Sequence, residues 1–212
     1  MSINAGSPLA ALLIQQASAI NWIMNTALET HFVGIEEYLS GEERSDIRHE
    51  FIGGVIYAMA GGSDEHNIIS LNLASALRQH VRGGSCSVFM TDVKTRLNIA
   101  NEDIFYYPDV MVCCDPRDTN RYYKLYPKVL MEVLSQTTER TDRREKFLSY
   151  IQIETLEEYV MAAQSKMEVT IFRRANYWKP EVLTLAEQEM KLTSLNFSLP
   201  LRDVYEAIKF AT

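Results

Sequence analysis

The spacing of hydrophobic residues predicts that the longest helix of the chain spans residues 63–82. Apolar residues recur at every fourth position of this segment, at Ile69, Leu73, Leu77 and Val81. This period places them on one packed face of a helix. Ser63 is a suitable N-cap, and Gly83-Gly84 would end the helix.

Three other segments also favour helix. Residues 34–39 predict a short helix with its apolar side chains on one side, and the tail 201–210 looks helical. Residues 139–150 form a basic segment with an apolar stripe and predict a further helix.

Strand patterns fill most of the remaining chain. Residues 49–60 predict a hairpin that turns on Gly53-Gly54. Single strands are predicted at 86–99, 104–114, 128–134 and 159–163, and a last hairpin pairs 167–174 with 177–185. The order of helices and strands is irregular, so we expect an α/β (α+β mixed) fold with a mixed sheet, and not a regular array of strand–helix–strand units.

The length of 212 residues fits one domain, which we place at residues 32–212. Residues 1–31 are expected to form an N-terminal extension, either helical or poorly ordered. Its apolar part is interrupted by Gln15, Gln16, Asn21 and Asn25. These residues argue against a transmembrane helix, and the segment lacks a typical signal-peptide layout.

The charge balance limits how this protein could bind nucleic acid. The formal net charge is −7, which argues against nonspecific coating of nucleic acid through bulk charge. Residues 117–146 nevertheless hold eight Lys or Arg against five Asp or Glu, a local charge of +3. A localised basic groove and a solvated surface face are both compatible with this segment.

The three cysteines, Cys86, Cys113 and Cys114, show no pairing pattern. Neighbouring side chains of a strand point to opposite faces, so a Cys113–Cys114 disulfide is not expected. No Cys-x-x-Cys or paired-His spacing suggests zinc. These observations favour a reducing, cytoplasmic location.

Two carboxylates stand inside apolar strand segments, Asp109 in residues 104–114 and Glu132 in residues 128–134. A buried carboxylate is costly unless another group compensates its charge. If the two strands pair in register, both acids can meet on one face. Oxygen ligands of this kind suit Mg²⁺ or Mn²⁺, but each acid could instead pair with an Arg or cap a turn. The residues alone leave both interpretations open.

Several further residues could complete such a site. Lys146 flanks the apolar stripe of its helix and could reach the two acids, although pairing with Asp142 at the surface is the simpler interpretation. Glu50 could supply a third acid, and His66 could contact a phosphate; a surface or capping role is the ordinary alternative for each. Lys94 and Arg96 are weaker candidates.

An ordered series of motifs resembles the Uma-two family, restriction-endonuclease-like proteins of the PD-(D/E)XK nuclease superfamily. The resemblance covers roughly residues 32–200. The motifs are Glu36-Glu-Tyr-Leu, Arg48-His-Glu-Phe-Ile-Gly-Gly, Met59-Ala-Gly-Gly-Ser-Asp-Glu-His66, Tyr107-Pro-Asp-Val, Met131-Glu-Val-Leu-Ser135 and Asp142-Arg-Arg-Glu-Lys-Phe.

The resemblance implies a central mixed sheet flanked by helices, with extra hairpins, and hydrolysis of phosphodiester bonds that depends on Mg²⁺ or Mn²⁺. It implies that Asp109, Glu132 and Glu50 are the metal-binding acids. The superfamily pattern has a lysine where this chain has Leu134, so Lys146 would take over the role of positioning the attacking water. His66, Lys94 and Arg143 are candidate substrate-binding residues.

The resulting hypothesis is a cytoplasmic endonuclease that acts on nucleic acid, with DNA as the expected substrate and no membrane association. Because nuclease domains often cut both strands as dimers, a homodimer is a further expectation. Two alternatives stay open: a noncatalytic module that binds nucleic acid or protein, and a hydrolase of small phosphoesters.

Overall fold

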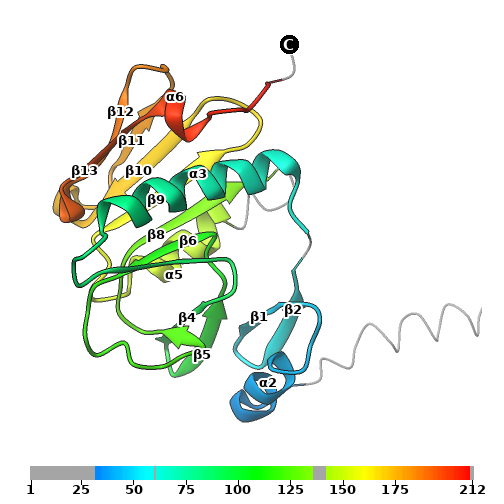
Figure 1. Cartoon of the computed structure of the whole chain (residues 1–212). Helices are drawn as coiled ribbons and strands as arrows, with labels where there is room; N and C mark the ends of the chain where they lie inside the picture. Colours follow the sequence, from blue (N-terminus) through cyan, green and yellow to red (C-terminus); the bar gives the residue numbers. More distant parts are fainter. Residues whose placement is uncertain (1–31, 60, 136–141, 211–212) are drawn as a thin grey trace, which may run out of the picture.

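The computed structural model describes residues 32–59, 61–135 and 142–210; the side chains of Asp142 and Arg143 lie outside the described part. The expectations for residues 1–31 and for the start of the basic helix fall outside it as well. Figure 1 shows α3 lying across one face of a sheet, with α5 on the other. The helices are α2 (Ile35–Glu42), α3 (Asp64–His80), α5 (Phe147–Tyr150) and α6 (Leu201–Val204).

The strands of the described residues form two larger sheets and one hairpin. The six-stranded sheet has the order β11-β10-β9-β8-β6-β3, and the five-stranded sheet has the order β2-β1-β5-β4-β7. Only the β8–β9 and β4–β7 pairs are parallel, so both sheets are mixed, as expected. The strands are β1 (His49–Ile52), β2 (Val55–Ala58), β3 (Ser87–Met90), β4 (Lys94–Ile99), β5 (Glu102–Tyr106), β6 (Val110–Cys113), β7 (Tyr123–Lys124), β8 (Pro127–Leu134), β9 (Glu158–Ala163), β10 (Val169–Arg173), β11 (Pro180–Leu183), β12 (Glu189–Leu192) and β13 (Phe197–Pro200).

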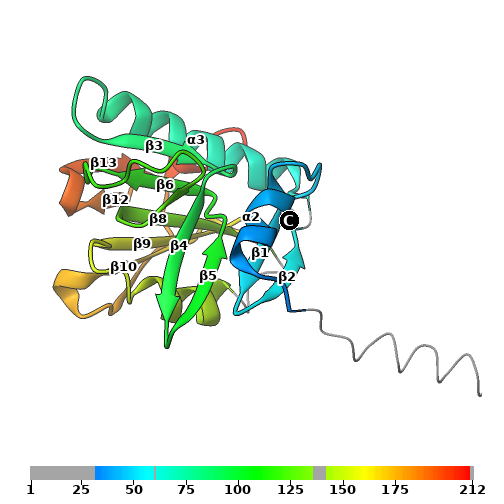
Figure 2. The same cartoon turned by 90° about the horizontal axis from the view of Figure 1, so that it is seen from below.

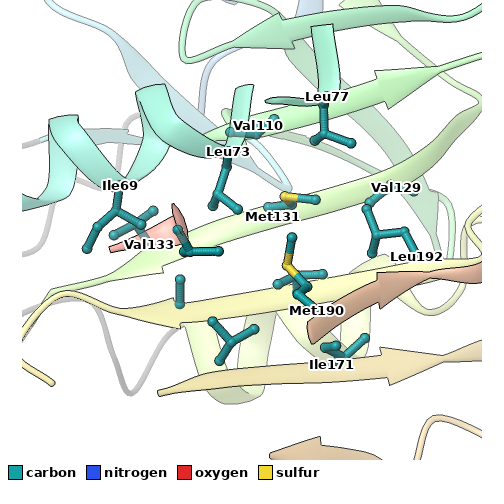
Figure 3. Close-up of a cluster of buried hydrophobic side chains, with 14 of the residues drawn as sticks. Ile69, Leu73, Leu77, Val110, Val129, Met131, Val133, Ile171, Met190 and Leu192 are labelled. Carbon is teal, nitrogen blue, oxygen red and sulfur yellow. The ribbon is translucent and has the colours of Figure 1, made fainter. Parts of the chain in front are cut away.

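The long helix forms where its sequence predicts. The Ser63 side chain accepts a hydrogen bond from the backbone N–H of His66 and so caps the first turn of α3. Ile69, Leu73 and Leu77 are buried on the side that faces the sheet. Figure 3 shows these side chains above those of the central strands.

Strand β8 runs through the centre of the core. Its side chains alternate between two apolar clusters: Val129, Met131 and Val133 face α3, whereas Leu130 and Leu134 face α5. Both faces of the strand are therefore covered, which explains its nearly continuous apolar sequence. Figure 3 shows the cluster on the α3 side.

Two strands that the sequence predicts as continuous are each broken. The expected strand 86–99 divides into β3 and β4, and the expected strand 104–114 divides into β5 and β6. In each case the two halves belong to different sheets. Pro108, which has no N–H to donate, lies at one break, and Thr91, at a positive φ of 45°, lies at the other.

The two breaks lie next to each other, because the backbone N–H of Thr91 donates to the Asp109 carbonyl at 3.3 Å. The four strands therefore form one long antiparallel ribbon that bends from one sheet into the other (Figure 2). Asp109 consequently lies at the bend and not within a strand, which corrects the expectation from the sequence.

Both predicted hairpins form, and the structure has one more hairpin near the C-terminal end of the described residues. Gly53 and Gly54 both have positive φ and make the turn between β1 and β2. The β10–β11 hairpin also forms as predicted. The β12–β13 hairpin was not predicted, and the expected helix 201–210 is confined to Leu201–Val204.

The structure pairs two cysteines that the sequence gave no reason to pair. Cys86 and Cys114 form a disulfide, and Cys113 is buried and free. Ser87 lies opposite Cys113 in the β3–β6 ladder. Cys86, just before β3, therefore lies opposite Cys114, just after β6. The sequence showed no pairing pattern because this bond depends on the pairing of strands that are distant in sequence.

The disulfide closes a sequence separation of 28 residues, and removing it should lower the free energy of unfolding by about 3 kcal/mol. Urea unfolding of the Cys86→Ser/Cys114→Ser variant measures this loss. Thiol titration of the unreduced, denatured wild type should detect Cys113 alone. Detection of all three thiols would contradict the bond.

Candidate functional site

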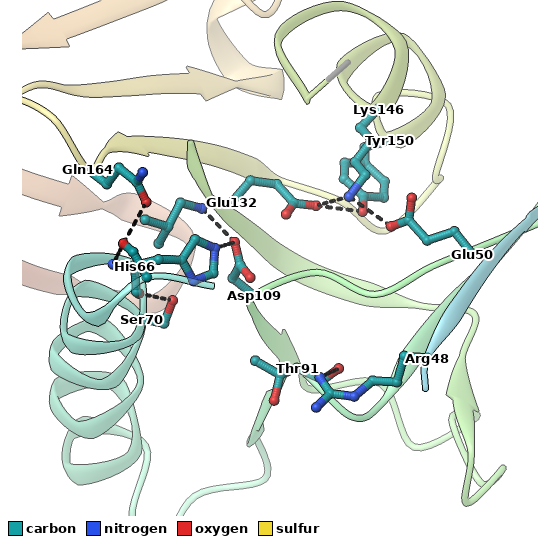
Figure 4. Close-up of polar contacts among 12 residues, drawn as sticks. Arg48, Glu50, His66, Ser70, Thr91, Asp109, Glu132, Lys146, Tyr150 and Gln164 are labelled. Atoms are coloured by element: carbon teal, nitrogen blue, oxygen red, sulfur yellow. Dashed lines mark hydrogen bonds and ion pairs between the residues drawn. The ribbon is translucent and has the colours of Figure 1, made fainter. Parts of the chain in front are cut away.

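Asp109 occupies the bend of the ribbon, immediately before β6. Its Oδ2 atom accepts a hydrogen bond of 2.7 Å from the backbone N–H of Val133 in β8. The same oxygen lies 3.2 Å from Nε2 of His66, in the first turn of α3. Only 8% of Asp109 is exposed, so these two contacts orient a buried carboxylate (Figure 4).

Glu132 lies beside Asp109, one strand away. Val110 pairs with Met131 in the antiparallel ladder, so Asp109 and Glu132 occupy the next opposed positions. The Glu132 side chain is buried on the face of β8 that it shares with Leu130 and Leu134, as the alternation predicts. The hydroxyl of Tyr150 donates to Glu132 Oε1 at 2.8 Å.

Lys146 reaches the acids from the π-helical turn Asp142–Lys146, which leads directly into α5. Its Nζ atom lies 2.8 Å from Glu50 Oε1 and 3.5 Å from Glu132 Oε1. The ammonium also lies 5.5 Å from the centre of the Tyr106 ring. Lys146 is 6% exposed, so the interpretation as a surface lysine is wrong. It contacts the acids Glu50 and Glu132, and its role at Asp109 stays a prediction.

Glu50 approaches the same ammonium from the other sheet. It lies in β1, which pairs with β5 through Phe51 and Phe105. The backbone N–H of Tyr107 donates to Glu50 Oε1 at 3.4 Å. Figure 4 shows Glu50 and Glu132 on opposite sides of Lys146. One ammonium therefore links the two sheets.

The electrostatic environment keeps Tyr150 protonated. Burial, together with the charges of Glu132 and Glu50, raises the pKa of this phenol well above its ordinary value. Tyr150 consequently remains a hydrogen-bond donor to Glu132 across the physiological pH range. Its hydroxyl and the Lys146 ammonium share one carboxylate oxygen.

A second buried network lies behind Glu50. Lys94 Nζ donates to the Tyr107 hydroxyl at 3.1 Å, and that hydroxyl donates to Glu42 Oε2 at 2.6 Å. The other oxygen of Glu42 lies 2.8 Å from His49 Nδ1. Burial lowers the pKa of the Lys94 ammonium, and Glu42 partly opposes this shift. The network anchors β1 at the residue that precedes Glu50.

The donor types fit a divalent cation at the paired acids. Asp109 and Glu132 offer carboxylate oxygens from adjacent positions, which is the ligand chemistry that Mg²⁺ and Mn²⁺ favour. Within the described ranges, no group of three or more His, Cys, Asp or Glu side chains is arranged to hold a metal. Glu50 contacts Lys146 instead, and its role as a third metal ligand stays a prediction.

The remaining predicted residues lie in different places. His66 joins the site through Asp109, whereas Lys94 belongs to the second network and Arg96 pairs with Asp103 at 2.8 Å. The side chain of Arg143 is outside the described part of the chain. The sequence interpretation missed Tyr150 as a polar partner, because its position in the apolar stripe suggested packing alone. The i, i+4 spacing from Lys146 was the available signal.

Comparison with known proteins assigns the chain to a family. The profile of the Uma2 family, described as "Putative restriction endonuclease", matches residues 35–202. The chain belongs to the Uma2 family. The Uma2 match begins in α2, ends in α6 and includes every residue of the cluster around Lys146.

Two relatives come from Synechocystis sp. and are both named as uncharacterized proteins. The protein slr1290 is 34% identical over 177 residues, which cover 82% of this chain and 92% of that protein. The protein sll1609 is 33% identical over 144 residues, which cover 66% of this chain and 80% of that protein. Neither name carries an activity.

A solved structure shares the fold. It is described as a putative nuclease belonging to DUF820 from Anabaena variabilis, and the match has a TM-score of 0.67 at 16% identity. The match covers 82% of this chain and 97% of that one. The Uma2 chain therefore has the fold of that structure, as the sequence predicted. Within its described residues, no helix is both long and apolar enough to cross a membrane.

Removal of the Tyr150 hydroxyl should weaken the acid cluster. Tyr150→Phe removes the hydrogen bond from this hydroxyl to the buried Glu132 carboxylate, and we expect a loss of about 2 kcal/mol in the free energy of unfolding. Urea unfolding measures the loss. The control Tyr177→Phe removes an exposed hydroxyl and should leave stability unchanged. Equal stability of the two variants would show that Glu132 does not depend on this bond.

The buried amine of Lys94 predicts a pH effect on stability. Its pKa in the folded protein lies below the ordinary value of 10.5, so the unfolded chain binds this proton more tightly. The wild type should therefore gain stability relative to Lys94→Met as the pH rises from neutrality toward about 10. Urea unfolding at a series of pH values tests this. A constant difference between the two proteins would contradict the lowered pKa.

Proposed function

We propose that this chain is an endonuclease that hydrolyses DNA phosphodiester bonds with Mg²⁺ or Mn²⁺. The observation that carries the proposal is the convergence of Lys146, Glu132 and Glu50, beside Asp109, in a member of the Uma2 family. A lysine next to paired acids supplies the positive charge that a phosphodiester and its attacking water require.

Asp109 and Glu132 would hold the metal ion, which when bound lowers the pKa of a water molecule and offsets charge on the phosphate. The Val133 N–H and His66 fix the orientation of Asp109. Tyr150 does the same for Glu132. Because these partners are in place before substrate arrives, the acids need little rearrangement to act.

Lys146 would position the attacking water and contact the phosphate. Leu134 occupies the position where the superfamily pattern has a lysine, and its side chain packs in the apolar cluster next to α5. The Lys146 ammonium approaches the same face of β8 from the adjacent turn. We assign Glu50 to holding this ammonium, with metal ligation as its alternative role.

A noncatalytic nucleic-acid-binding module is the second candidate. Lys146 already neutralises charge on Glu50 and Glu132, and this arrangement also serves a purely structural purpose. Such a module would bind DNA without dependence on a metal. Formation of a homodimer and a cytoplasmic location remain predictions for either function.

Plasmid nicking in the presence of Mg²⁺ or Mn²⁺ tests the proposal. We expect the wild type to nick, and Asp109→Asn and Lys146→Ala to be slower by about 100-fold or more, because each lacks a group that acts on the water or phosphate. The control Lys166→Ala removes an exposed lysine and should nick at the wild-type rate.

Measurements of metal binding and DNA binding distinguish the nuclease from the noncatalytic module. Calorimetric titration with Mn²⁺ should show binding that Asp109→Asn loses, while circular dichroism confirms that the variant is folded. DNA binding by a folded wild type that neither binds metal nor nicks would favour the noncatalytic module. Nicking that persists in Lys146→Ala would overturn the role of that lysine and direct attention to Lys94.

A further inference from the structure

A groove separates α3 from the edge of the six-stranded sheet. Its volume is about 590 Å³, and it is lined by Ala74, Ser75, Arg78, Gln79, Arg82, Val88 and Met90. A second hollow, which shares Arg78 and Val88, continues it to Gly83, Gly84 and Cys86. Figure 2 shows α3 and β3 running side by side along this edge.

The groove carries positive charge from two arginines. Arg78, in the last turn of α3, and Arg82, in the turn that follows the helix, are both exposed. Among residues 32–59, 61–135 and 142–210, no acidic side chain forms an ion pair with either guanidinium. In a chain of net charge −7, two adjacent arginines without acids favour an anionic ligand.

The other groups of the groove suit a sugar–phosphate backbone. β3 is an edge strand that pairs only with β6 in the described part, so its outer edge offers backbone N–H groups. Ser75 and Gln79 add side-chain donors, while Val88 and Met90 form an apolar floor. Arginines, amides, hydroxyls and backbone N–H groups are the usual donors to nucleic-acid phosphates.

The groove leads to the candidate active site. Met90 pairs with Val110, the neighbour of Asp109, and the next residue, Thr91, donates to the Asp109 carbonyl. From Cys86 to Met90 the chain extends about 14 Å along the groove. A backbone lying in the groove would therefore arrive at Asp109.

We propose that the α3–β3 groove binds the phosphate backbone of duplex DNA, with Arg78 and Arg82 each contacting one phosphate. The inference rests on the proposed function for its substrate, and it adds a binding site outside the acid cluster. A second copy of the chain is a poorer occupant, because symmetric pairing along β3 would bring the arginines of both copies together. Such like charges repel.

The salt dependence of DNA binding tests the proposal. Fluorescence anisotropy with a labelled 20-base-pair duplex is measured in EDTA on the Asp109→Asn protein, so cleavage cannot interfere. Adding Arg78→Gln and Arg82→Gln should weaken binding at low salt by about tenfold or more. It should also reduce the slope of log affinity against log salt by about 1.8, since each phosphate contact contributes about 0.9.

Two matched variants serve as controls in the same background. Lys166→Gln/Lys179→Gln removes two exposed charges from the turns on either side of β10, near the opposite edge of the sheet, and should keep the parental slope. Arg78→Lys/Arg82→Lys keeps the charges and should retain most of the affinity. Thermal unfolding shows whether each variant is folded.

Three results would overturn the groove as the DNA site. The first is no duplex binding by the parent at low salt, and the second is an equal salt slope for Arg78→Gln/Arg82→Gln and the control Lys166→Gln/Lys179→Gln. The third is a lower oligomeric mass that appears only in Arg78→Gln/Arg82→Gln. The last would point to a second copy as the occupant. Wild-type nicking with an unchanged slope in the arginine variant would reject the groove and keep the nuclease. If the slope changes as predicted but the wild type neither nicks DNA nor binds metal, the groove is kept as a DNA site and the nuclease is rejected.

Discussion

The position of the site depends on one ammonium that contacts a buried carboxylate, Glu132, and a partly buried one, Glu50. Glu50 belongs to the five-stranded sheet and Glu132 to the six-stranded sheet, and Lys146 contacts both. Removing one partner from a buried ion pair typically costs about 3–5 kcal/mol, because the other charge is left uncompensated. The three elements that carry these residues are therefore constrained to meet at one point. The acids lie there for electrostatic reasons, whatever reaction they support.

The sequence named the residues of this cluster through local signals and family motifs, but it left their arrangement open. Strand alternation placed Glu132 on the face of Leu130, and the apolar stripe of the following helix directed Lys146 toward that face. The family motifs then singled out Glu50, whose chain position is remote. The long helix and the first hairpin were equally predictable, since Ser63 and the Gly53-Gly54 turn act on their immediate neighbours.

What the sequence could not reveal depends on contacts between distant segments. The bend at Thr91 and Asp109 arises because two sheets cross there, and neither segment alone shows that it changes sheets. The Cys86–Cys114 bond likewise follows from the β3–β6 register. The Tyr107 hydroxyl was unpredictable as a polar partner, because a buried tyrosine in an apolar pattern is indistinguishable from a packing residue until its neighbours are known. For Tyr150 the spacing from Lys146 was the available local signal.

The acidic character of the chain and the binding of a polyanion are compatible for a physical reason. At physiological ionic strength, charges separated by more than about 8 Å are largely screened, so the net charge of −7 does not govern a local contact. Lys146 offsets part of the charge on Glu50 and Glu132, while Asp109 has a backbone N–H and His66 as partners. Arg78 and Arg82 present positive charge at the other end of α3. An approaching phosphate backbone would therefore encounter arginines that no described acid pairs with before it reached the acids, and the local order of charges, not their sum, would direct it along the groove.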